Sequence, residues 1–252
     1  MDMSFGTKQY SNFRIETYLQ CKRKYYYIYM ARQVKDDDIQ RPYLTDGQFC
    51  HDVLRHYRAE LKKQPPEANR RKIMSWCFDL YSKMYDPRTM NLAMCKDMLI
   101  EYFLRYQHEP RGNSIELEEK FNIPFGNINL IGTIDRVDQI GENEYNILDY
   151  KTTNKPHYLD SSLQGAIYYA AGKHKYGVDA KINVGYVLLK FESEIKWIDE
   201  AVLQAKVHDI IPACQKIIGE KNWRERTVSP LCDYCDYASS CFPNTWKPEL
   251  LV

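Results

Sequence analysis

Hydrophobic residues recur at helical spacing through most of the first 110 positions. The segment 46–63 shows the pattern most clearly, with Phe49, Val53, Leu54, Tyr57 and Leu61 falling on one face of a helix. Segments 67–85 and 91–107 have the same character, and prolines separate the three. The pattern therefore predicts three helices within a helical part that runs from residue 11 to about residue 110.

The spacing changes to a period of two after this helical part. Hydrophobic residues alternate over 115–125, at Ile115, Leu117, Phe121, Ile123 and Phe125. Further strands are predicted at 129–138 and 144–151, because turn residues at 126–127 and 141–143 separate them. These three strands form an antiparallel meander.

A helix predicted at 162–177 divides the meander from the remaining strands, and a glycine closes it. Strands predicted at 181–190 and 193–200 precede a last helix over 199–219, which we expect to bend at Pro212. A helix between the third and fourth strands indicates a crossover connection. The fold class is therefore α/β, with a mixed central sheet flanked by helices.

The length of 252 residues suits one sizeable hydrophobic core. We expect a single domain over 1–252, with a helical annex at 1–110, a core at 111–220 and a cysteine-rich tail at 221–252 that packs with the N-terminus. Hydrophobic residues make up 44% and charged residues 27%, which is ordinary for a globular protein. The net charge of +1 neither establishes nor excludes a nucleic-acid partner.

No run of eighteen apolar residues is present, and the N-terminus lacks the pattern of a secretory signal. We therefore expect no membrane partner and a cytoplasmic location. In such a reducing compartment, metal binding is favoured over disulfides for the eight cysteines.

Acidic residues stand near the ends of two neighbouring predicted strands. Asp135 lies near the end of the second strand, and Asp149 and Lys151 end the third. Two converging carboxylates repel each other unless a cation lies between them, and Mg²⁺ or Mn²⁺ suits oxygen ligands. The carbonyl of Tyr150 could add a ligand, and Lys151 could polarise a water. The alternatives are a surface ion pair or ordinary polar residues at a strand end.

Three cysteines lie close together in the tail. Cys232, Cys235 and Cys241 have the spacing C-x2-C-x5-C, which is typical of a soft-metal site that lacks one ligand. The cysteines in helical stretches, Cys50, Cys77, Cys95 and Cys214, are interpreted as small buried hydrophobes.

The sequence GTIDRVD (132–138), followed by a turn and an apolar run into DYKT (149–152), resembles the PD-(D/E)XK nuclease superfamily, and specifically its RecB-like exonuclease branch. Asp149 stands where other branches have glutamate, and Ile134 replaces the usual proline. The resemblance implies that the single domain is a nuclease domain with catalytic residues Asp135, Asp149 and Lys151.

Two helix motifs extend the resemblance. GQFCH (47–51) resembles the G-x-x-x-H motif, which implies that His51 ligates a metal; the alternative is an ordinary surface or core histidine. QGAIYY (164–169) resembles the Q-x-x-x-Y motif, which implies that Gln164 and Tyr168 face the DNA backbone; the alternative is a helix face packed on the sheet. A glutamate before the first strand pair is also implied, and both Glu118 and Glu119 are candidates.

The stretch SNFRIETYLQCKRKYYY (11–27) resembles the opening of the RecB-like nucleases that carry a 4Fe–4S cluster, with Lys22 in place of proline. This implies Cys21 as the fourth ligand beside Cys232, Cys235 and Cys241; zinc is the alternative metal. The segment 22–29 mixes cations and tyrosines, as single-strand grooves do, but it also suits a helix with tyrosines in the core.

Together these motifs imply a Mg²⁺- or Mn²⁺-dependent DNA exonuclease acting on single-stranded DNA or DNA ends, similar to the RecB and AddB nuclease domains and to CRISPR-adaptation exonucleases. Protein partners in a recombination, repair or CRISPR-type complex are conceivable. The rival hypothesis is a nucleic-acid-binding or processing subunit of such a complex, with turnover that needs a partner or is lacking.

Overall fold

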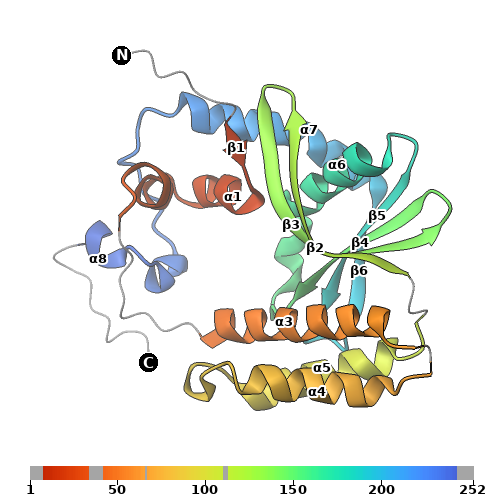
Figure 1. Cartoon of the computed structure of the whole chain (residues 1–252). Helices are drawn as coiled ribbons and strands as arrows, with labels where there is room; N and C mark the ends of the chain where they lie inside the picture. The colour runs from red at the N-terminus through yellow and green to blue at the C-terminus, as the bar shows by residue number, and fades with distance from the viewer. Residues whose placement is uncertain (1–7, 34–41, 66, 110–112, 243–252) are drawn as a thin grey trace.

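A computed structural model describes residues 8–33, 42–65, 67–109 and 113–242. Its centre is a six-stranded mixed sheet (Figure 1). The strands are β1 (Gln9–Tyr10), β2 (Ser114–Phe125), β3 (Ile128–Gly141), β4 (Glu144–Lys151), β5 (Lys181–Leu188) and β6 (Glu194–Ile198). Their order is β1-β3-β4-β5-β6, and β2 pairs with β3. The predicted mixed sheet is confirmed.

The connections follow the predicted topology. The strands β2, β3 and β4 form the antiparallel meander. Helix α6 (Gln164–Tyr176) then crosses over, so that β5 lies parallel to β4, and β6 returns antiparallel to β5. The crossover matters for function because it sets the start of α6 near the end of β4.

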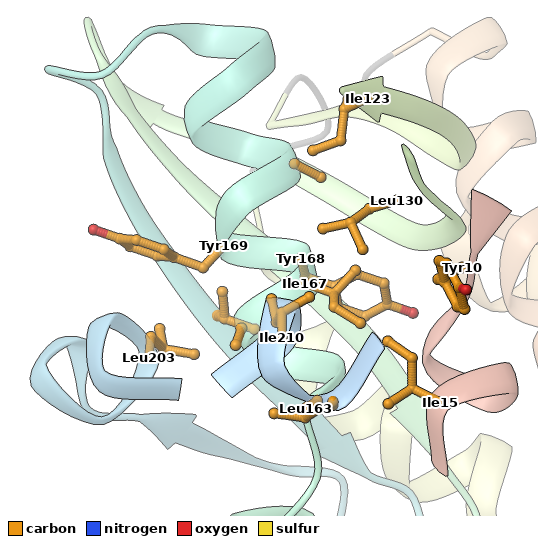
Figure 2. Packing of buried hydrophobic residues seen from close by; sticks show 14 of the residues in the cluster. Tyr10, Ile15, Ile123, Leu130, Leu163, Ile167, Tyr168, Tyr169, Leu203 and Ile210 are labelled. Atoms are coloured by element: carbon orange, nitrogen blue, oxygen red, sulfur yellow. The ribbon is translucent and has the colours of Figure 1, made fainter. Parts of the chain in front are cut away.

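Alternate residues of β4 pack into two different hydrophobic cores, one on each face of the sheet. Ile147 belongs to a core shared with α1 (Asn12–Gln20), α6 and α7 (Glu200–Gly219). Figure 2 shows this side, where residues of α6 and α7 such as Ile167 and Ile210 meet Leu130 of β3. Leu148 and Tyr150 belong instead to a core with three helices of the annex. The period-two pattern of the strand thus places helices on both faces of the sheet.

The annex consists of α3 (Pro42–Lys63), α4 (Arg70–Ser82) and α5 (Leu92–Tyr106). In Figure 1, α3 lies against the lower side of the sheet, with α4 and α5 beyond it. Helix α4 is shorter than predicted because Asn69 caps it, its side chain accepting a hydrogen bond from the Lys72 amide at 3.1 Å. Helix α7 runs as one helix through Pro212, and the expected bend stays a prediction.

The first and last described segments pack together. Tyr18 donates a hydrogen bond to Glu220 at 2.7 Å, and the rings of Tyr27 and Tyr237 stack with their centroids 5.4 Å apart. The tyrosine-rich segment forms α2 (Lys22–Tyr25) and a π-helix, η1 (Tyr26–Met30), with Tyr25 and Tyr27 buried. The segment is helical with part of its tyrosines in the core, and a contribution to a single-strand groove stays a prediction.

The remaining elements are short. They are the 3₁₀ turns η2 (Pro87–Thr89), η3 (Pro156–Asp160) and η4 (Pro230–Tyr234) and the single-turn helix α8 (Ala238–Cys241). No helix in the described part of the chain is long and apolar enough to cross a membrane.

Candidate active site

The candidate site lies where β3 and β4 separate. Their pairing ends at Arg136 opposite Leu148, and β1 next pairs with β3 at Asn129 and Leu130. Near the point where the β3–β4 pairing ends, backbone groups form hydrogen bonds with side chains instead. The Tyr150 amide donates to the Asp135 carboxylate at 2.8 Å, so the separation of the strands itself fixes this carboxylate.

Helix α3 brings His51 to the same place. Its Nδ1 lies 3.3 Å from Asp135 Oδ2, and its Nε2 donates to the Tyr150 carbonyl at 2.8 Å. A Cβ atom added at Gly47 would lie 3.2 Å from Thr152 Oγ1. The glycine of the predicted motif therefore lets α3 approach the end of β4 closely, in addition to sharing a helix face with His51.

Glu118 completes a group of potential metal ligands. Its carboxylate, the imidazole of His51 and the carboxylate of Asp135 offer ligand atoms that all lie within 4.8 Å of one another. The neighbouring Glu119 forms an ion pair with Lys175 at 2.5 Å. The geometry therefore favours Glu118 over Glu119, a choice that the sequence left open.

The backbone of Glu118 is unusual for a strand residue. Its φ angle is +52°, in the left-handed region, which costs a residue with a side chain on the order of 1–2 kcal/mol. The register of β2 against β3 is nevertheless continuous from Glu116 to Phe125, and it sets Glu118 opposite Asp135.

The charges of His51, Glu118 and Asp135 shift one another's pKa values. Burial alone would lower the pKa of His51, but the nearby Asp135 charge outweighs it and raises the pKa to about 9. Burial likewise favours protonation of Asp135, but the charge and hydrogen bond of His51 hold the pKa of this carboxyl below its usual range. Burial and the charge of Asp135 raise the pKa of Glu118. The group therefore brings two carboxylates and an imidazole together, which are donor types that suit a divalent cation.

Asp149 and Lys151 form a second group beside the first. Lys151 Nζ lies 2.7 Å from Asp149 Oδ2 and donates to Gln164 Oε1 at 2.8 Å. Burial favours the neutral amine, but the charge of Asp149 outweighs it and raises the pKa of Lys151. The lysine therefore stays charged, and its side chain shares a face with Asp149, as the strand period predicts.

Asp149 is held by the first turn of α6 rather than by the His51 group. Its Oδ1 accepts hydrogen bonds from Gln164 Nε2 at 3.1 Å and from the Tyr168 hydroxyl at 2.9 Å. Because Lys151 pairs with its other oxygen, both oxygens face protein groups. Burial raises the pKa of Asp149. The predicted role of Asp149 as a metal ligand stays a prediction.

Tyr168 lies within the site beside Asp149, and its predicted contact with the DNA backbone stays a prediction. The side chain is only 5% exposed, and its hydroxyl lies 2.9 Å from both Asp149 Oδ1 and the Thr133 carbonyl. Gln164 donates to that hydroxyl at 2.9 Å. The hydrogen bonds of Gln164 and Tyr168 hold Asp149 and Lys151 in place.

The four predicted cysteine ligands line one cavity of about 20 Å³, between the start of α2 and the tail. They are Cys21, Cys232, Cys235 and Cys241, and all four are half-buried thiols. No three of the four sulfurs lie within 4.8 Å of one another. Four thiols around a small enclosed space suit a soft metal centre, so this donor set fits either metal expected from the sequence.

Comparison with known proteins identifies the class. The profile of the PD-(D/E)XK nuclease superfamily matches residues 9–242. The chain belongs to this superfamily, and the membership supports a nuclease. Superfamily members use divalent metals, which agrees with the His51, Glu118 and Asp135 group.

Solved structures support the fold. The crystal structure of a proposed exonuclease from Eubacterium rectale is similar at a TM-score of 0.54 and 12% sequence identity, over 94% of this chain and 88% of that one. The crystal structure of the protein SSO0001 matches over 93% of this chain and 96% of that one at 16% identity, but its TM-score of 0.30 carries no argument. Among curated proteins, none matches this sequence.

Proposed function

We propose that this protein is a Mg²⁺- or Mn²⁺-dependent deoxyribonuclease that acts as an exonuclease on single-stranded DNA ends. The observation that carries the proposal is the meeting of His51, Glu118 and Asp135 within 4.8 Å, beside the half-buried Lys151. Family membership supports the nuclease class. The proposed substrate, single-stranded DNA ends, rests on the resemblance of the sequence motifs to those of RecB-like exonucleases.

In this proposal, His51, Glu118 and Asp135 hold the ion, and Asp149 and the Tyr150 carbonyl are the further predicted ligands. Binding of the ion would displace a proton from His51. A bound Mg²⁺ or Mn²⁺ ion supplies polarisation of the scissile phosphate and an acidified water. Lys151 is charged and fixed by its contacts with Asp149 and Gln164, 2.7 and 2.8 Å away. It orients the attacking water and offsets the negative charge that develops on the phosphate.

The four-cysteine site forms the second part of the proposal. We propose that Cys21, Cys232, Cys235 and Cys241 hold a 4Fe–4S cluster, with zinc as the alternative. Tetrahedral zinc–thiolate bonds of about 2.3 Å bring sulfurs to within about 4 Å of each other. The four thiols line one cavity and suit either metal. The choice of the cluster rests on the resemblance of the sequence motifs to the RecB-like nucleases that carry one.

The function is tested by the variant Lys151→Ala, assayed on labelled single-stranded DNA with Mn²⁺. We expect cleavage to fall by at least a thousandfold, because both the orientation of the water and the compensating charge are lost, while the circular dichroism spectrum is retained. The matched control is Lys181→Ala. Lys181 begins β5 at the other end of the same ladder and forms an exposed ion pair with Glu144 at 2.7 Å.

The same assay distinguishes the proposed nuclease from the rival hypothesis of a binding or processing subunit. Strand binding without Mn²⁺-dependent cleavage by the wild-type protein, alone and with candidate partners, would favour the binding subunit. Cleavage by Lys151→Ala at the wild-type rate would remove the role assigned to the lysine.

A further inference from the structure

A cluster of charged side chains is buried in the apolar layer between the annex and the sheet. Arg136 is 1% exposed and Arg58 is 4% exposed. Around them lie the hydrophobic residues that α3 and α5 pack against β4 and β5. The site chemistry described above uses neither arginine, and buried charges are costly, so their presence here requires an explanation.

The two arginines share their partners. Both donate to Glu109 Oε2, Arg58 at 2.7 Å and Arg136 at 2.9 Å. Both also donate to the hydroxyl of Tyr102, at 2.9 Å from Arg58 Nε and 3.1 Å from Arg136 Nη1. Arg136 further pairs with Asp138 through two hydrogen bonds, one of them 2.7 Å from Nε. Two cations thus meet two carboxylates, and the formal charge of the cluster is zero.

Tyr102 connects this cluster to Tyr150. Because its hydroxyl oxygen accepts bonds from both guanidinium groups, its own proton is free for the Tyr150 hydroxyl, 3.2 Å away. Tyr102 is fully buried, and its ring lies edge-on to that of Tyr150 at 5.7 Å. The network therefore joins α3, α5, β3 and β4 through bonds with strict geometry.

Each end of the network is adjacent to the candidate metal site. Arg136 directly follows Asp135 on β3, and the Tyr150 carbonyl accepts the bond from His51. Arg58 follows His51 by seven residues on α3, which is two helical turns or about 10.5 Å. Helix α3 thus contacts the strands through polar groups at two levels, one in the metal site and one in the network.

We propose that the network of Arg58, Tyr102, Glu109, Arg136 and Asp138 sets the register of α3 against β3 and β4, and so positions His51 relative to Asp135 for metal binding. These are positioning residues, because they touch neither ion nor substrate. The inference rests on the proposed function, since it assigns the network to the same metal site.

An apolar interface alone would leave that register less well defined. Hydrophobic cores tolerate small shifts and repacking, whereas displacement of α3 here would break bonds to two buried cations and leave them unpaired. Fixing register is the best supported role for buried charged groups in proteins. A metal site needs this precision, because its ligands come from α3, β2 and β3.

The test is the variant Tyr102→Phe, with Tyr106→Phe as the matched control. Tyr106 is on the same helix, is 9% exposed, and donates to the Ser193 carbonyl at 2.5 Å, outside the network. The measurements are Mn²⁺ binding to the full chain by titration calorimetry without DNA, and the melting temperature without metal. We expect Tyr102→Phe to weaken Mn²⁺ binding about tenfold, and Tyr106→Phe to change it less than twofold at a comparable loss of melting temperature.

Equal Mn²⁺ affinities of Tyr102→Phe and wild type would overturn the inference while leaving the proposed function intact. A wild-type protein that binds no Mn²⁺ would instead remove the proposed metal site, and the inference with it. Should Tyr102→Phe not fold, Tyr150→Phe removes only the outer hydroxyl and keeps the backbone carbonyl. We expect a threefold weakening for it, and unchanged affinity would contradict the proposal.

Discussion

At the scale of single residues, the carboxylates of Asp135 and Asp149 have different surroundings and therefore different roles. Asp135 meets His51 and the Tyr150 amide, at 3.3 and 2.8 Å, which holds its pKa low. Asp149 is held between the first turn of α6 and Lys151, and burial raises its pKa. The two aspartates that the sequence places together are thus distinguished by their hydrogen-bond partners, which come from different helices.

Tyr168→Phe tests the task assigned to Asp149. The change removes the hydroxyl that lies 2.9 Å from Asp149 Oδ1 but keeps the ring in the core. We expect the cleavage rate to fall about tenfold, equivalent to about 1.4 kcal/mol, because the Asp149–Lys151 pair loses one of its supports. Single-turnover cleavage of labelled single strands measures the effect.

The control for this variant is its neighbour on the same helix. Tyr169 donates to Glu200 at 2.8 Å, away from Asp149, so Tyr169→Phe should cleave at nearly the wild-type rate. Similar losses in the two variants would indicate a general weakening of α6 instead of a role for Tyr168 in the site.

Much of the candidate site was predictable from sequence because its residues stand in local motifs. The strand period placed Asp149 and Lys151 on one face, and the helix motifs singled out His51, Gln164 and Tyr168. The choice of Glu118 was not fully predictable, because the spacing to Phe121 favoured it while the opposite-facing alternation of Glu118 and Glu119 left the choice open. Nor was the network of Arg58 and Glu109, since 51 positions separate these two residues and no local pattern links them.

At the scale of elements, a close cross-strand contact connects the meander to the site. Phe121 on β2 lies opposite Gly132 on β3, and its ring lies edge-on to that of Tyr168 at 6.3 Å. A Cβ atom at Gly132 would come within 2.5 Å of the Phe121 ring. The glycine of the GTIDRVD motif therefore provides room for an aromatic ring that covers it.

Gly132→Val should destabilise the protein because it forces Phe121 off this position. Overpacking of this kind costs about 1–3 kcal/mol, which is several degrees in melting temperature. The same substitution at Gly219, an exposed position with no atom within 4 Å of an added Cβ, should shift the melting temperature much less. Equal shifts in thermal unfolding would show that the Phe121 contact is unimportant.

The elements themselves were largely predictable, but their ends were not. Periodicity predicted all strands except β1, whose two residues are too short to show a period. Helix α3 begins at Pro42 rather than at residue 46, and α4 ends at Ser82 rather than at residue 85. Capping and tertiary contacts decide such boundaries, and a hydrophobic pattern does not contain them.

At the scale of the whole molecule, the first and last described segments are joined around the cysteine cavity. Lys22, which stands where the resembling family has proline, forms ion pairs with Glu220 at 3.0 Å and Glu225 at 2.8 Å. Ion pairs close to the surface contribute little stability. A metal centre that joins Cys21 to the tail closes a loop of about 210 residues, which on a chain-entropy estimate stabilises by about 4–5 kcal/mol.

Cys241→Ala should therefore lose bound iron or zinc and lower the melting temperature by roughly 10 °C. Metal content, visible absorption and thermal unfolding check this expectation. Cys214→Ala is the control, because Cys214 is a buried thiol within the core and does not line the cavity. Full metal content in Cys241→Ala would exclude this cysteine as a ligand, and an unchanged melting temperature would exclude the stabilising role.

The central claim is that one divalent ion binds where α3 meets the separating strands. Anomalous diffraction from crystals grown with Mn²⁺ tests it most directly. The account predicts a manganese peak in contact with His51, Glu118 and Asp135, with Lys151 beside it. A peak ligated by other residues, or no peak at a Mn²⁺ concentration that supports cleavage, would contradict it.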